Sequence, residues 1–180
     1  MKLFVAIAFI LSLTNSALGK TLTASQKDNK VSWIAVGFPG FLKIVGEGGK
    51  VEGILLEENG KASGSLKVNV AKFSTGMELR DEHMHKKFLG SDIIPEATLT
   101  INPVEVKAGA IPFTGKLQIK SDTKPVAGEL ILKPVAGGWS VKGSFAIKLT
   151  DYPSIGVPSH LGITVAEKVD ISVDLVFDEK

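Results

Sequence analysis

The chain has 180 residues and no cysteine, and its charges nearly balance, with 21 Lys and Arg against 19 Asp and Glu. The absence of cysteine excludes thiol catalysis, cysteine-ligated zinc and iron–sulfur clusters. A formal net charge of +2, with no block of like charges, argues against nucleic acid as the main partner. Composition alone leaves binding proteins, enzymes and structural proteins open.

The N-terminus has the features of a secretory signal peptide. A short basic start precedes an apolar run over 3–13, which is too short to span a bilayer. Ala17 and Gly19 are the small residues that a signal peptidase recognises, so we expect cleavage after Gly19. This predicts a signal peptide over 1–19 and one domain over 20–180, located in the periplasm or secreted. An uncleaved membrane anchor is the alternative.

Most of the remaining chain alternates apolar and polar residues, which is typical of strands with one apolar face. The longest such stretch extends over twelve positions from Trp139 to Thr150. Asn59 and Gly60 predict a hairpin turn, because both residues tolerate positive φ. Strands are expected over 31–36, 41–46, 50–58, 66–71, 97–107, 113–120, 127–134, 140–150 and 168–178.

One segment, 77–89, departs from this period and predicts a short helix. It lacks Gly and Pro, its acidic residues come early, and Lys86 and Lys87 come late, which suits the helix dipole. Gly90 is placed to end the helix.

The densest polar cluster of the chain lies in this predicted helix. Asp81 and His85 are four residues apart and would share a helix face, where Glu78 could join them in a metal site. The cluster lacks the His-Glu-x-x-His spacing of a zinc enzyme. The other interpretations are general acid–base chemistry by a histidine and a hydrogen-bonded tie that holds the helix against the sheet. We favour the tie, and we expect no metal.

Many strands with almost no helix must either stack as two sheets or close into a barrel. An eight-stranded barrel is just wide enough to be filled by its own side chains or to hold one small ligand. Periodicity does not decide between these two outcomes.

Several ordered segments of the chain resemble the YceI-like family. Residues 74–84, which include Arg80-Asp81-Glu82-His83, resemble its Arg-Asp-x-His-Leu segment. Residues 94–99 resemble its Tyr-Pro-x-Ala-Thr-Phe stretch, residues 113–126 resemble a Thr-Gly-x-Leu-Thr-Ile strand and turn, and residues 145–152 resemble a late Phe-x-Ile segment. The resemblance extends over about 31–177. The sequence departs from the family pattern at Leu89, Gly90, Ser121, Asp122 and Leu149.

The resemblance implies an all-β fold, an eight-stranded antiparallel lipocalin-like barrel with one short helix near 77–89. It also implies a long apolar pocket for a polyisoprenoid, an isoprenoid quinone or a fatty amide, and export to the periplasm. Arg80, Asp81 and His83 match the polar trio of the family, which we interpret as a structural tie.

We therefore predict an exported, non-enzymatic protein that sequesters or carries an amphiphilic lipid in the barrel interior. The expected partner is the small lipid, with no cofactor and no nucleic acid, and a homodimer stays open. The alternatives are an enzyme that acts on a lipid through His83 with Asp81 or Glu82, and a stress-linked structural protein with a filled core. The expected ligand-binding residues are Trp33, Phe41, Phe73, Phe113, Phe145 and Val173.

Overall fold

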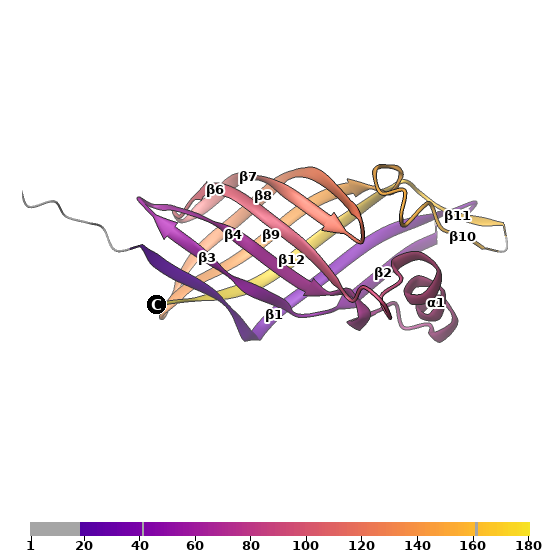
Figure 1. Cartoon of the computed structure of the whole chain (residues 1–180), viewed down its shortest axis with the longest axis horizontal. Coiled ribbons are helices and arrows are strands. Elements are labelled where there is room, and N and C mark those ends of the chain that lie inside the picture. The colour runs from indigo at the N-terminus through magenta and orange to yellow at the C-terminus, as the bar shows by residue number, and fades with distance from the viewer. Residues whose placement is uncertain (1–18, 41, 161) are drawn as a thin grey trace, which may run out of the picture.

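The computed structural model describes residues 19–40, 42–160 and 162–180, which form a β-barrel with a helix at one end (Figure 1). Among these residues, eight strands make the wall in the order β1–β12–β9–β8–β7–β6–β4–β3, and β3 pairs back onto β1. Every pairing along this path is antiparallel. The structure thus confirms the eight-stranded antiparallel barrel. The signal peptide predicted over 1–19 lies outside the described residues except for Gly19.

Five of the eight wall strands, β1, β4, β7, β8 and β12, are longer than their alternating patterns predicted, and the other three are not. The wall strands are β1 (Lys20–Phe38), β3 (Val51–Glu58), β4 (Lys61–Asn69), β6 (Glu96–Glu105), β7 (Gly109–Ile119), β8 (Asp122–Val135), β9 (Gly138–Lys148) and β12 (Lys168–Glu179). Short strands extend or flank the wall, namely β2 (Leu42–Gly48), β5 (Phe73–Ser74), β10 (Ser159–His160) and β11 (Ile163–Val165). Two 3₁₀ turns, Val70–Lys72 and Leu149–Asp151, end β4 and β9.

The first strand shows the largest difference from the sequence prediction, which placed it at 31–36. β1 begins at Lys20, and a bulge between Ala24 and Asn29 interrupts its pairing with β12. The bulge divides β1 into a half that pairs with β3 and a half that pairs with β2. At the division the Asn29 amide donates to the Val51 carbonyl and accepts from the Val51 N–H. The Asn29 side chain therefore replaces backbone hydrogen bonds that the bulge removes. The bulge also interrupts the alternation of apolar and polar residues in the sequence of this strand.

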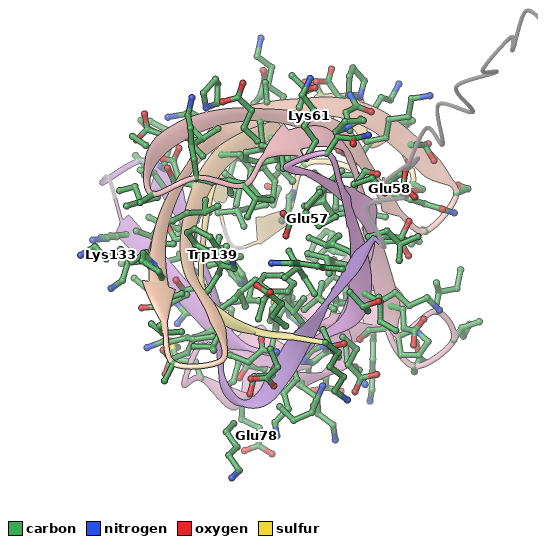
Figure 2. All side chains as sticks on the ribbon, turned by 90° about the vertical axis from the view of Figure 1, so that its left-hand side faces the viewer. Glu57, Glu58, Lys61, Glu78, Lys133 and Trp139 are labelled. Atoms are coloured by element: carbon green, nitrogen blue, oxygen red, sulfur yellow. The ribbon has the colours of Figure 1, made fainter. Side chains whose placement is uncertain are left out.

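The apolar face of each strand points into the barrel. Along β7 the burial alternates strictly from Ile111 to Ile119, with Ile111, Phe113, Gly115, Leu117 and Ile119 buried and the residues between them exposed. Seen along the barrel, the strands form a ring from which Lys61 and Lys133 project outward (Figure 2). Alternation in the sequence does not decide which face of each strand points inward. Closure of the barrel decides it, because the interior must be continuously apolar.

The hairpin turn predicted at Asn59-Gly60 is confirmed. Asn59 and Gly60 have φ values of 52° and 73° and connect β3 to β4. Such positive φ values are open to Asn and Gly at little steric cost.

The helical segment lies at the end of the barrel away from the C-terminus, together with β2, β10 and β11 (Figure 1). It begins as α1 (Glu78–His83), continues as a π-helix over Met84–Leu89 and ends at Gly90, whose φ is 58°. The predicted range 77–89 is therefore confirmed, although its second half is wound more widely than an α-helix. No helix within the described ranges is long and apolar enough to cross a membrane.

Candidate functional site

The barrel encloses a cavity of about 550 Å³ whose wall is almost entirely apolar. All eight wall strands contribute to it, and α1 and the π-helix line one end. Four apolar residues line the cavity and are also between 37% and 57% exposed: Leu42, Met77, Leu79 and Ile163. They come from β2, the helical segment and β11, so the mouth of the cavity lies at the helix end of the barrel.

Most of the expected ligand-binding residues line this cavity. Trp33 lies on β1, Phe73 on β5, Phe113 on β7, Phe145 on β9 and Val173 on β12. The structure therefore brings together five positions that are far apart in the sequence. Phe41, the sixth expected residue, lies outside the described residues. That these residues contact a ligand stays a prediction.

Two of the aromatic rings are arranged around a glycine. Phe113 and Phe145 meet edge to face, with ring centroids 5.8 Å apart and planes at 87°. Gly128 lies between them on β8, opposite Phe145 and Phe113 in the two adjoining ladders. A Cβ at Gly128 would lie 2.2 Å from the Ser144 carbonyl oxygen and 2.7 Å from the Phe145 Cβ. Only glycine therefore allows both rings to pack here.

A similar pair shapes the wall near the mouth. Trp33 on β1 is the register partner of Gly46 on β2. A Cβ at Gly46 would lie 2.2 Å from the indole ring, so the ring lies directly against the glycine. The Trp33 indole covers the backbone at this point and forms part of the cavity wall.

The first turn of α1 is fixed to the preceding loop by Asp81. Its carboxylate accepts hydrogen bonds from the Ser74 hydroxyl at 2.6 Å, the Thr75 N–H at 2.7 Å and the Thr75 hydroxyl at 2.5 Å. Burial by itself would raise the pKa of Asp81, but these bonds and nearby His85 outweigh it and lower the pKa below its ordinary value of 3.8. Asp81 is therefore an ionised acceptor that holds the loop.

Arg80 is held by the same threonine from the other side. Its Nε donates to the Thr75 hydroxyl at 2.7 Å and its Nη2 donates to the Thr75 carbonyl at 2.9 Å. The Thr75 hydroxyl thus accepts from Arg80 and donates to Asp81, linking the two residues. Arg80 also lines the cavity, as does His83 three positions further on, so this face of the helix points inward.

His85, which belongs to the polar cluster interpreted from the sequence as a tie, a metal site or an acid–base group, has a protein partner at each ring nitrogen. His85 Nε2 lies 2.8 Å from the Phe73 carbonyl oxygen, and Nδ1 lies 2.8 Å from the Ser91 hydroxyl. A carbonyl only accepts, so the proton is on Nε2, and in the neutral ring Nδ1 accepts from Ser91. No group of three or more metal-binding side chains gathers within the described ranges. In the sequence, nothing but its helical spacing distinguished His85 from His83.

A second tether comes from the barrel wall. Lys120, at the end of β7, donates from Nζ to the Phe88 carbonyl at 3.2 Å and the Ser154 carbonyl at 2.5 Å. Asp122, where the family pattern has an apolar residue, accepts from the Ser154 N–H at 2.8 Å. The end of the π-helix and the loop after β9 are thus connected through one ammonium group.

These features define a lipocalin-like barrel with a helical mouth, and the sequence matches a known family of that shape. The family model described as the YceI-like domain matches residues 23–177, and the chain belongs to this family. Among curated proteins, no sequence matches the chain.

Solved structures support the fold at low sequence identity. A polyisoprenoid binding domain from Saccharophagus degradans aligns with a TM-score of 0.68 and 15% identity, covering 89% of this chain and 98% of that domain. BcnA from Burkholderia cenocepacia aligns with a TM-score of 0.66 and 20% identity, covering 82% and 95%. The YCEI protein of Campylobacter jejuni has a TM-score of 0.58 and 16% identity, covering 76% and 85%.

Proposed function

We propose that this protein binds an amphiphilic lipid, with the hydrocarbon tail in the barrel and the polar head at the helical mouth. The observation that carries the proposal is the apolar cavity of about 550 Å³. A volume in this range is typical of small-molecule sites, whereas a filled core leaves voids of little more than a water molecule. A cavity of this size argues against the alternative of a stress-linked structural protein with a filled core.

The cavity volume bounds the tail. At roughly 30 Å³ for each water-sized group, the cavity holds on the order of 18 carbon-sized groups. Each buried methylene contributes about 0.8 kcal/mol, so an apolar wall is sufficient for tight binding of such a tail. A C16–C20 acyl chain or a C15–C20 isoprenoid fits, and a much longer polyisoprenoid would extend beyond the mouth.

The protein carries or stores this lipid in the periplasm or outside the cell and breaks no covalent bond. The predicted signal peptide supports export, and the similarity to a polyisoprenoid binding domain supports the lipid. The enzymatic alternative has less support, because it needs Asp81 or Glu82 beside His83 in the cavity. Of Asp81, Glu82 and His83, only His83 is part of the described cavity lining. The Asp81 carboxylate accepts hydrogen bonds from Ser74 and Thr75.

The test is native mass spectrometry of the protein purified from its own host, followed by extraction of the bound molecule. We expect one hydrocarbon-tailed amphiphile per chain. The delipidated protein should rebind a C18 fatty acid or geranylgeranyl chain with a dissociation constant in the micromolar range or below. A delipidated, folded protein that rebinds neither chain would overturn the proposal.

A further inference from the structure

We infer that the cavity selects an amphiphile with an anionic head group, a carboxylate or a phosphate, which binds at Arg80. This inference rests on the proposed lipid-binding function and adds the chemistry of the head. The long apolar wall gives no preference between a fatty acid, an amide and an alcohol of the same tail. Any selection must come from the few polar groups that the cavity exposes.

Those polar groups are unequal in charge. Among the described residues the lining contains no Asp and no Glu, whereas Lys67, Arg80 and His83 are present. The Lys67 ammonium forms an ion pair with Glu96 at 2.9 Å, and both side chains are about half exposed on the wall. The cation left to the cavity at its mouth is therefore Arg80.

Arg80 has donors to spare. A guanidinium group carries five N–H donors, and Thr75 receives one from Nε and one from Nη2. None of the ion pairs in the described part of the chain includes Arg80. Three N–H groups are thus available in a fixed orientation, since Thr75 holds the guanidinium in place. A guanidinium group matches the paired oxygens of a carboxylate or phosphate.

The carboxylate of the neighbouring residue, Asp81, does not cancel the preference of Arg80 for an anionic head group. The Asp81 oxygens accept hydrogen bonds from Ser74 and Thr75 and are not part of the cavity lining. Arg80 and His83, three residues apart, lie on the helix face that lines the cavity, and Ser159 adds a hydroxyl to the lining. An anionic head would complete the coordination of Arg80 while its tail remains among apolar side chains, where low dielectric strengthens the pair.

The experiment varies the head group of the lipid and keeps the hydrocarbon tail constant. Binding of oleate, oleamide and oleyl alcohol is measured by calorimetry, and geranylgeranyl phosphate is compared with geranylgeraniol. We expect the anion to bind at least tenfold more tightly than its neutral partners in one or both series. The series with the larger ratio identifies carboxylate or phosphate as the cargo head. The ratio is measured on the unsubstituted protein and does not depend on the folding of any variant.

Two variants then assign the preference. Arg80→Gln should reduce the anion-to-neutral ratio to about one, with the larger loss of affinity in the anionic partner. Lys86→Gln removes one positive charge from the exposed side of the same helical segment and should leave the ratio unchanged. Equal binding of anionic and neutral heads in both series, or a ratio that survives Arg80→Gln, would overturn the inference and leave the proposed function standing. Failure of every amphiphile to bind would count against the proposed function itself.

Discussion

The wall of the barrel and its helical end are built on different principles. In the wall, from β6 to β9, apolar and polar residues alternate and hairpins connect neighbours in sequence order. At the helical end, shape depends on a few hydrogen bonds that the side chains of Asp81, His85 and Lys120 make with loop or backbone groups. The wall therefore sets the volume and polarity of the cavity, and the helical end sets its mouth and its head-group chemistry.

A charged side chain in the wall should have the largest effect on lipid binding, because the wall sets the polarity of the cavity. Phe145→Asp puts a carboxylate among apolar side chains, where an isolated charge is strongly disfavoured. We expect lipid affinity to fall at least 100-fold, measured by displacement of a fluorescent fatty acid. Ala146→Asp, the exposed next residue on β9, is the matched control and should bind normally. If Phe145→Asp takes up lipid unchanged and remains folded by circular dichroism, the tail lies elsewhere.

A methyl group in the wall tests packing without charge. Gly128→Ala forces a Cβ against the Ser144 carbonyl and the Phe145 side chain, so the Phe113–Phe145 contact must open. We expect the free energy of unfolding to fall by about 2 kcal/mol, measured by urea denaturation. Ala127→Ser, the exposed preceding residue, should change it little. An unchanged midpoint for Gly128→Ala would mean that the two rings tolerate more space than their geometry indicates.

At the helical end a single substitution should act locally. Asp81→Asn keeps the size of the side chain but weakens three hydrogen bonds to a charged acceptor. We expect the opening free energy of α1 to fall by about 1–2 kcal/mol, measured by amide hydrogen exchange, with the wall strands unchanged. Glu78→Gln, exposed in the same helix, is the control. Equal loss of protection in the wall would mean that the two regions unfold as one unit.

Lowering the pH should also weaken the hydrogen bonds of Asp81 and destabilise α1, to a smaller extent than Asp81→Asn. The pKa of Asp81 is lowered in the folded protein, so its contribution to stability is complete above the unfolded value near 3.8. It is lost as the pH falls through the lower folded value. The protection factors of the α1 amides, which are corrected for the intrinsic pH dependence of exchange, should therefore be unchanged from pH 7 to about pH 5 and fall only below about pH 4. A fall in protection already at pH 6 would assign the tether to a histidine instead.

The same division explains what could be predicted from the sequence. Alternation and the Asn59-Gly60 turn predicted the strands of the wall, and the resemblance to the YceI-like family implied their closure into a barrel. Alternation left the inward face of each strand open, and closure with an apolar interior decides it. The first half of β1 was missed, since the Asn29 bulge removes the period there. Four of the expected cavity residues, Trp33, Phe113, Phe145 and Val173, lie on predicted strands, and Phe73 lies next to one. The partners of Arg80, His85 and Lys120 could not be predicted, because they are loop residues and carbonyl groups that leave no pattern in the sequence.

The central claim is that the barrel interior holds one hydrocarbon tail of about 18 carbons. Its most direct test is calorimetry of the delipidated protein with a series of saturated fatty acids from C8 to C20. Because the head group is constant, affinity should rise about fourfold for each added methylene, as 0.8 kcal/mol per CH₂ requires, and level off near C18. Affinity that does not depend on tail length would contradict the account.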